Sequence, residues 1–266
     1  MKLWLNGQLI DASEARIDPT DRGFTLGDGL FESLKVCEGQ PLRLAAHLRR
    51  LQAGADALAI PLPFAPAVLT AAMTAVITAN AVQAGLLRLT LSRGPAPRGL
   101  AIPAVMRPTL LILAAPAAPP APPARAIIAR CTRRNEFSPL ARFKTLNYLD
   151  NVLARREADQ NEADEALLLN SQGRLSESTV ANLFLVIDGT VLTPPIEEGA
   201  LPGVMRAEII DRLGAKIQPL DPGDLGRASE AFLTNANGAR ALVMVDGKPI
   251  GDGQPGPVTL GLHQIK

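Results

Sequence analysis

The sequence has few residues of the kinds that hold metals or form covalent cross-links. Its 266 residues include only two histidines, His47 and His263, and two cysteines, Cys37 and Cys131. A multi-histidine metal site is therefore not expected, and a Ser-His-Asp hydrolase would have to use one of these two histidines. Because the cysteines are far apart and match no metal-binding spacing, neither a zinc site nor a disulfide framework is expected, and a reducing compartment is the default.

Lysine is scarce as well, and the charges of the two signs nearly cancel. Lysine and arginine together number 27, of which six are lysines, against 26 acidic residues, and the formal net charge is +1. Such a balance produces no overall field that would attract nucleic acid or an anionic membrane. Chemistry that depends on a lysine has few candidate residues.

The N-terminal sequence MKLWLNGQLI has no apolar core and no cleavage site of a secretory signal, so a cytoplasmic location is expected. One stretch without charged residues, 57–87, is long enough to span a bilayer. Three prolines interrupt its first third, and the remainder alternates apolar residues with Thr at helical spacing. Five apolar positions are expected on one face of a helix: Val68, Leu69, Met73, Val76 and Ile77. This pattern predicts an amphipathic or buried helix rather than a membrane span.

A proline-rich segment, AAPAAPPAPPA at 114–124, separates two apolar parts of the chain. Prolines favour an extended backbone and remove amide donors, as is typical of semi-rigid linkers. We expect a small N-terminal α/β domain over 1–115, an interdomain linker over 116–124 and a larger C-terminal domain over 125–266. Both domains have sensible sizes.

Apolar periodicity predicts mixed α/β structure in both parts. Strands are expected at 3–10, 31–44, 86–92, 109–115, 125–131, 166–170, 182–188, 191–195, 231–238 and 241–247. Helices are expected on the apolar stripe that begins at Leu44, in the segment without charged residues, over 147–160, and over 205–214 with its end at Gly214. Because no strict βαβ repeat is present, a doubly wound fold is not expected.

Lys144 is the best candidate for an enclosed, reactive amine. It lies between Phe143 and an apolar run just before a predicted helix, although a surface lysine near a helix start fits equally well. Lys35, in the middle of a strand, is ambiguous. Surface positions are expected for the other four lysines: Lys2, Lys216, Lys248 and Lys266.

Other polar residues have both a structural and a functional interpretation. In ALPGVMR the amides of Val204 and Met205 start a helix and suit a phosphate, but a plain turn explains them too. Glu177 precedes an apolar strand and could cap a turn or face a site. Arg50 flanks the buried side of its helix and is either a solvated charge or a phosphate ligand.

Four sequence blocks, taken together and in this order, identify a protein family more specifically than any one of them: 21–51, 144–158, 173–195 and 200–206. They are similar to the class IV aminotransferases, the pyridoxal phosphate (PLP) enzymes of fold type IV. This family includes branched-chain and D-amino acid aminotransferases, R-selective amine transaminases and 4-amino-4-deoxychorismate lyase. The resemblance runs from Trp4 to about Gly247 and implies a two-domain fold, a small α/β domain followed by a larger pseudo-barrel domain. It also implies a homodimer.

The resemblance implies roles for residues in these blocks. Lys144 would form the aldimine with PLP, and Glu177 would pair with the pyridine nitrogen. Arg50, in the H-L-x-R-L block, would bind the phosphate, together with the amides of Val204 and Met205. No histidine is required.

Two further positions follow from the same resemblance. The T-N-A stretch of Thr234, Asn235 and Ala236 matches a second phosphate-binding turn, with Ala236 where some relatives have a hydroxyl. Tyr148 lies near the position of a tyrosine beside the phenolic oxygen of the cofactor, with a spacing one residue shorter.

The loop TLSRGPAPRGLAIP at 90–103 bears on the substrate. D-amino acid transaminases resemble it through an arginine at Arg98, but Leu100 replaces their histidine and Phe31 replaces their tyrosine. Aminodeoxychorismate lyases resemble it through S-R-G and R-G. We expect amino-group transfer between a small amino acid, of D or branched-chain type, and a 2-oxo acid. The alternative is the lyase, which releases pyruvate and 4-aminobenzoate in folate biosynthesis. No nucleic acid, membrane or metal partner is expected.

Overall fold

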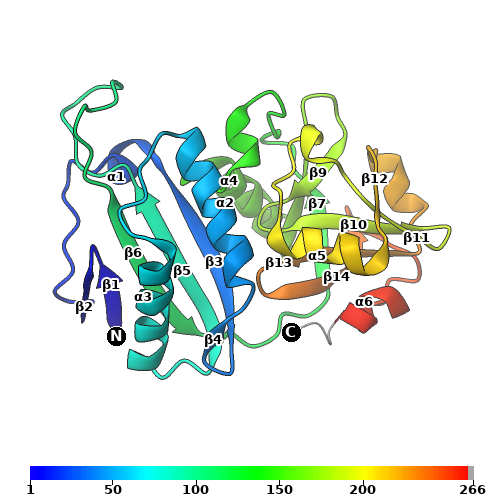
Figure 1. Ribbon diagram of the computed structural model, residues 1–266. Coiled ribbons are helices and arrows are strands. Elements are labelled where there is room, and N and C mark those ends of the chain that lie inside the picture. Colours follow the sequence, from blue (N-terminus) through cyan, green and yellow to red (C-terminus); the bar gives the residue numbers. More distant parts are fainter. Residues whose placement is uncertain (263–266) are drawn as a thin grey trace. The chain divides into compact units, whose positions relative to one another are not determined.

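Two separate β-sheets organise the chain, each in its own structural unit (Figure 1). The structure, a computed structural model, describes residues 1–262, so His263 and Lys266 lie outside the described residues. The first unit contains Met1–Pro119 and Phe143–Asn147, and the second contains Pro120–Arg142 and the chain from Tyr148 onward.

The first unit is built on a six-stranded antiparallel sheet in the order β2-β1-β6-β5-β3-β4. The strands are β1 (Lys2–Leu5), β2 (Gln8–Asp11), β3 (Gly29–Cys37), β4 (Gln40–Pro41), β5 (Ala84–Ser92) and β6 (Thr109–Pro116). The helices are α1 (Arg22–Leu26), α2 (Leu44–Ala57) and α3 (Pro66–Ala79). Helices α2 and α3 cover one face of this sheet (Figure 1).

Alternation along β3 determines which of its side chains enter the core under these helices. Leu34 and Val36 are buried in the core cluster, whereas Ser33 and Lys35 on the other face are half-buried. The helix predicted in the segment without charged residues is α3, and four of its five expected core residues are buried. The fifth, Val68, is 45% exposed, so its placement on the apolar face was wrong. It lies one position from Leu69, about 100° away around the helix.

The segment Phe143–Asn147 returns to the first unit and runs beside the start of β3. The Phe31 amide donates to the Lys144 carbonyl at 2.8 Å, and the Leu146 amide donates to the Gly29 carbonyl at 3.0 Å. These bonds fix the backbone of Lys144 against a core strand. Sequence periodicity contained no sign of this pairing, because it joins residues more than a hundred positions apart.

The second unit contains a nine-stranded mixed sheet. Its strands are β7 (Ala124–Ile128), β8 (Glu165–Leu169), β9 (Leu175–Ser178), β10 (Asn182–Ile187), β11 (Thr190–Thr193), β12 (Lys216–Ile217), β13 (Glu230–Asn235), β14 (Gly238–Val245) and β15 (Lys248–Pro249). Its α-helices are α4 (Leu149–Gln160), α5 (Val204–Leu213) and α6 (Pro257–Leu262), and its short 3-10 helices are η1 (Pro139–Arg142), η2 (Ile196–Glu198) and η3 (Pro222–Gly226).

Six of these strands close into a barrel. The order β10-β13-β14-β7-β8-β9 returns to β10 because Asn182 also pairs with Glu177 of β9. The pairs β14–β7 and β7–β8 are parallel, and the others in the ring are antiparallel. The barrel that the family resemblance implied is therefore present, and its closure falls on a residue expected to bind the cofactor.

No helix within residues 1–262 combines the length and the apolar character needed to cross a membrane. The helix without charged residues, α3, has 14 residues. The helix expected over 205–214 is α5, which ends at Leu213 with Gly214 in the left-handed conformation, as predicted.

Candidate active site

Glu177 lies at the point where the barrel of the second unit closes. Its side chain is buried, and its backbone pairs with Asn182 at the start of β10. Asn182 in turn pairs with Thr234 of β13. Three adjacent strands therefore bring Glu177 and Thr234, which are 57 positions apart in the chain, to either side of one asparagine.

Three donors bind the Glu177 carboxylate. Arg134 Nη2 forms an ion pair with one oxygen, and the other accepts from the Leu201 amide at 2.9 Å and from Asn182 Nδ2 at 3.3 Å. A carboxylate offers about four acceptor positions, so Glu177 retains the capacity to accept one more hydrogen bond. A protonated pyridine nitrogen is a donor of the kind that this carboxylate can accept.

Arg134 brings a permanent positive charge to this carboxylate. Burial by itself lowers the pKa of Arg134, but the charge and hydrogen bond of Glu177 outweigh it, so that the pKa lies above its usual range. Tyr148, the half-buried residue before α4, lies within electrostatic range of Arg134.

Helix α5 begins directly beside Asn182. A Cβ atom at Gly203 would lie 2.0 Å from Asn182 Oδ1, so only glycine allows the helix to start this close to β10. No side chain among residues 1–262 caps the helix N-terminus. The amides of Val204 and Met205 are among the first-turn donors that have no acceptor within the helix, and the helix dipole adds positive potential there. This arrangement suits an anion.

Thr234 supplies a further polar group on the same three strands. Its Oγ1 atom is buried without a hydrogen-bond partner among residues 1–262. Because buried hydroxyls are normally satisfied, this one fits a ligand that accepts a hydrogen bond, such as a phosphate. Asn235 and Ala236 lie at the β13–β14 turn, where Asn235 Oδ1 accepts from the Asn237 amide at 2.9 Å and so stabilises the turn itself.

Lys144, in the first unit, lies over an aromatic ring. Its Nζ atom is 4.3 Å from the centroid of the Phe31 ring, and the Arg88 guanidinium carbon is 3.8 Å from the same centroid. The Lys144 side chain is half-buried and Phe31 is buried on β3. The structure thus brings two predicted site residues, Lys144 and Phe31, into contact. It does so through the pairing of Phe143–Asn147 with β3.

Arg50 is held in a buried polar cluster of the first unit. Its Nε and Nη2 atoms donate to Glu32 at 2.8 and 2.7 Å, and His47 Nδ1 lies 2.7 Å from the same carboxylate. Burial by itself raises the pKa of Glu32, but Arg50 and His47 outweigh it and lower the pKa. The bidentate pair fixes the guanidinium plane of Arg50 on α2.

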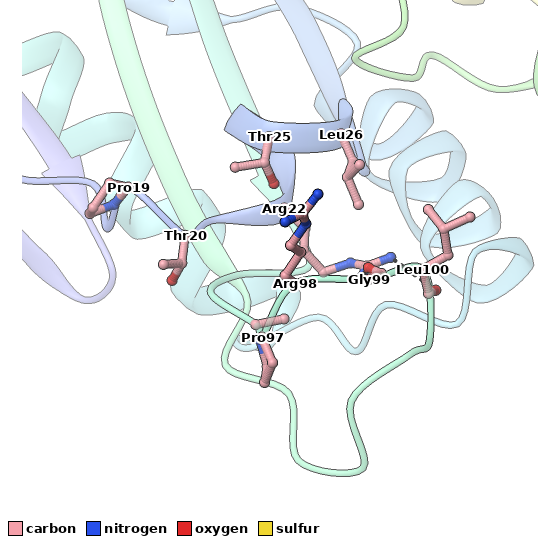
Figure 2. Close-up of a pocket in the computed structure, with 10 residues that line it drawn as sticks. Pro19, Thr20, Arg22, Thr25, Leu26, Pro97, Arg98, Gly99 and Leu100 are labelled. Atoms are coloured by element: carbon pink, nitrogen blue, oxygen red, sulfur yellow. Dashed lines mark hydrogen bonds between the residues drawn. The ribbon is translucent and has the colours of Figure 1, made fainter.

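Arg98 and Leu100 lie in the loop between β5 and β6, beside a cavity of about 470 Å³ (Figure 2). Both are exposed, and Leu100 is 81% exposed. Pro19, Thr20 and Arg22 also line this cavity. Arg98 and Arg22 therefore face the same space.

Sequence reasoning did not assign roles to several residues that organise these sites. No local sequence pattern marks Arg134 as a site residue, because its partner Glu177 is 43 positions away. His47 and Glu32 belong to the recognised 21–51 block, but the contacts of Glu32 with His47 and Arg50 depend on the packing of α2 against β3. Among residues 1–262, no cluster of three or more His, Cys, Asp or Glu side chains could hold a metal ion.

The chain is similar to known proteins over nearly its whole length. The family model "Amino-transferase class IV" matches residues 29–240. A putative branched-chain-amino-acid aminotransferase of Methanocaldococcus jannaschii is 30% identical, covering 99% of this chain and 94% of its own. A D-alanine aminotransferase of Bacillus licheniformis is 28% identical, with coverages of 97% and 93%.

Two solved structures bear on the fold and on the cofactor. A branched-chain amino acid aminotransferase solved with pyridoxamine 5'-phosphate matches with a TM-score of 0.91 at 28% identity, covering 99% of this chain and 92% of that one. The 4-amino-4-deoxychorismate lyase of Pseudomonas aeruginosa matches with a TM-score of 0.84 at 34% identity, covering 98% and 96%. The protein belongs to the class IV aminotransferases, enzymes that use PLP as their cofactor.

Proposed function

We propose that this enzyme transfers an amino group between a small amino acid, of D or branched-chain type, and a 2-oxo acid. The observation that carries the proposal is the arrangement on β9, β10, β13 and α5. Within residues 1–262, three groups are neighbours of Asn182: a carboxylate that can accept one more hydrogen bond, a buried hydroxyl without a partner and a helix N-terminus without a side-chain cap.

Each of these groups has a task in binding PLP. Glu177 would accept a hydrogen bond from the protonated pyridine nitrogen, while Arg134 keeps a positive charge beside the carboxylate. The Val204 and Met205 amides and Thr234 would donate hydrogen bonds to the phosphate. Arg50, fixed by Glu32, would add its charge at the phosphate, as the family motif implies. Asn235, Ala236 and Tyr148 are proposed to line the cofactor.

PLP, when bound, supplies an electron sink that stabilises negative charge at the substrate α-carbon. Lys144 would hold the cofactor through Nζ, and its amine, when free, would be the base that takes up and returns a proton at the substrate α-carbon. Phe31 below the amine supplies an apolar floor that limits its hydration. Arg98 is proposed to bind the substrate carboxylate, with Leu100 and Phe31 shaping the space beside it.

A lyase acting on 4-amino-4-deoxychorismate is the second candidate, because the Pseudomonas aeruginosa enzyme is 34% identical. The S-R-G motif that the loop shares with lyases does not separate the two functions. Ser92 donates to Asp21 at 2.9 Å, and Arg93 is buried against Asp28. Both side chains therefore maintain the loop, whichever substrate is used.

The family resemblance also carries the proposal of a homodimer, which light scattering tests. The cysteine usage favours a reducing, cytoplasmic location.

Absorbance spectroscopy of the purified protein tests the function. We expect a visible band from covalently bound PLP that disappears in Lys144→Ala and persists in Lys35→Ala, a half-buried lysine of the same unit. D-Alanine or L-leucine should bleach this band with formation of pyridoxamine 5'-phosphate. Release of pyruvate and 4-aminobenzoate from aminodeoxychorismate, with the band retained, would support the lyase instead. A protein that stays colourless with added PLP would contradict both.

A further inference from the structure

The loop that carries Arg98 is narrow at its base and projects at its tip. Residues 93–108 join β5 to β6, and we call them the Arg98 loop. At the base, Gly94 has a φ of +88°, and a Cβ atom there would lie 1.8 Å from the Arg107 carbonyl oxygen. Only glycine allows the two sides of the loop to approach this closely. The tip, by contrast, is exposed at Arg98 and Leu100.

A buried arginine from another part of the chain binds the tip. Arg22, the first residue of α1, is only 6% exposed. Its Nη1 atom donates to the carbonyls of Gly99 at 2.9 Å and Ala101 at 3.3 Å, and its Nη2 atom donates to Leu100 at 3.4 Å. One planar guanidinium thus holds three successive carbonyls directly after Arg98.

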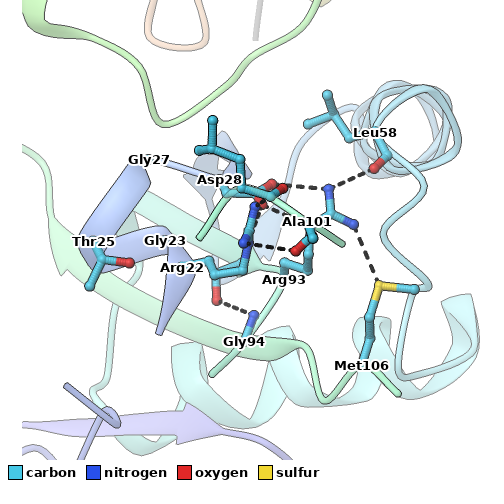
Figure 3. Close-up of polar contacts among 12 residues, drawn as sticks. Arg22, Gly23, Thr25, Gly27, Asp28, Leu58, Arg93, Gly94, Ala101 and Met106 are labelled. Carbon is cyan, nitrogen blue, oxygen red and sulfur yellow. Dashed lines mark hydrogen bonds and ion pairs between the residues drawn. The ribbon is translucent and has the colours of Figure 1, made fainter. Parts of the chain in front are cut away.

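Asp28 fixes this guanidinium in turn (Figure 3). Its carboxylate accepts from Arg22 Nε at 2.7 Å and from Arg93 Nε and Nη2 at 2.8 and 3.1 Å. Arg93 also donates to the carbonyls of Leu58 and Ala59, which follow α2. Asp28, directly before β3, therefore ties the Arg22 guanidinium at the tip to the first unit, whereas Arg93 ties the base of the loop to the residues after α2.

We propose that Arg22 is a positioning residue that holds Arg98 where a substrate carboxylate is bound, and so sets the preference for carboxylated amino donors. The inference rests on the proposed function of Arg98. Arg22 and Arg98 line the same cavity (Figure 2). Because Arg98 is exposed and has a long, flexible side chain, its backbone must be fixed for its guanidinium to be aimed.

Limited proteolysis of the PLP-loaded protein tests the clamp without any substrate. Trypsin can cut the Arg98–Gly99 bond at the tip, whereas Pro108 protects Arg107 and Arg93 is buried. We expect Arg22→Lys, which keeps the charge beside Asp28 but loses the planar fork, to speed this cut about tenfold. The matched control, Arg93→Lys, disturbs the same carboxylate but no carbonyl of residues 99–101.

We expect Arg93→Lys to be cut at Arg98 at close to the wild-type rate, even where it lowers the thermal midpoint as much as Arg22→Lys does. Mass spectrometry identifies the cut. If Arg22→Lys is cut no faster than wild type, or if both variants are cut equally fast, a general loss of stability explains the result and the clamp is refuted.

Steady-state kinetics tests the positioning role. For a carboxylated donor we expect Arg22→Lys to raise KM about tenfold with little change in kcat, and an amine without a carboxylate to be unaffected. In a double-mutant cycle, Arg22→Lys should have no further effect on KM once Arg98 is replaced by Ala. Equal losses with both donors, or independent effects of the two substitutions, would overturn the proposal.

The two experiments separate this inference from the proposed function. If no amino donor bleaches the cofactor in the wild-type protein, the proposed function fails and the role in substrate choice fails with it. In that case the trypsin experiment still decides whether Arg22 holds the loop. If the wild-type protein reacts with amino donors, and Arg22→Lys affects donors with and without a carboxylate equally, the proposed function stands and the positioning role is wrong.

Discussion

Replacement of Glu32 by Gln should destabilise the first unit and change its response to pH. Glu32 is 2% exposed and binds two guanidinium nitrogens of Arg50 and one ring nitrogen of His47. Gln has almost the same shape but no charge. The substitution therefore removes the ion pair while it perturbs packing very little.

The structure allows the magnitude to be estimated. Removal of one partner from a buried ion pair costs about 3–5 kcal/mol, because the other charge stays buried without compensation. The Gln side chain keeps one acceptor oxygen for Arg50 or His47, so we expect the lower end of this range, about 3 kcal/mol. Loss of the fixed Arg50 should also weaken PLP binding, since its guanidinium would no longer be held in one plane.

The pH dependence has a definite sign. Arg50 and His47 hold the pKa of Glu32 below its usual range in the folded protein, against the effect of burial. Its contribution is therefore fully present above the pKa of the unfolded chain and is lost as the pH falls through the lower folded value. The difference between the wild type and Glu32→Gln should be constant near neutral pH and shrink in acid.

Urea unfolding followed by tryptophan fluorescence measures this difference. Trp4 is the only tryptophan in the chain and is buried in the core of the same unit as Glu32. Glu14→Gln, at an exposed position of that unit, is the matched control and should change stability by less than about 0.5 kcal/mol. A Glu32→Gln loss below about 1 kcal/mol, or one equally large in acid, would refute the reasoning.

Two further predictions concern the Arg98 loop and the phosphate site. Gly94→Ala places a Cβ against the Arg107 carbonyl and should cost more than Gly173→Ala. At Gly173 the Cβ would meet open space, and only the backbone strain of a positive φ applies, about 1–3 kcal/mol. If the two variants shift the urea midpoint equally, the base of the loop can rearrange to accommodate the added Cβ atom. Thr234→Val removes a buried hydroxyl without a partner among the described residues, so the apoprotein should lose no stability while PLP binding weakens about tenfold or more. The control Thr193→Val removes a 2.8 Å hydrogen bond to the Leu183 carbonyl and should destabilise the apoprotein. Unchanged PLP binding in Thr234→Val would show that Thr234 does not bind the cofactor.

Local patterns accounted for most of the secondary structure. Alternation along β3 and the glycine that ends α5 act over a few residues, so the sequence displays them directly. The one wrong core assignment, Val68, shows the limit of such patterns. Its neighbour Leu69 already fills the buried side of α3, and spacing alone does not say which of two adjacent apolar residues turns inward.

The family motifs identified the class of enzyme and its candidate lysine. Lys144 and Glu177 were named from their sequence blocks, but a block does not show which residues surround them in the fold. The Arg134–Glu177 pair joins two separate stretches of sequence, and the Phe31 ring below Lys144 comes from a third. Contacts of this kind depend on strand pairing, which no local spacing encodes.

The sequence by itself thus determined the alternation of strands and helices and the family, and it supplied the candidate cofactor residues. Only the tertiary structure decided that Glu177 closes a barrel, that Thr234 has an unused hydroxyl among the described residues, and that Arg22 reaches a loop 77 positions away. The physical reason is the separation along the chain between the residues that interact. Propensity, capping and periodicity act between near neighbours, whereas buried charges find their partners only after distant strands have paired.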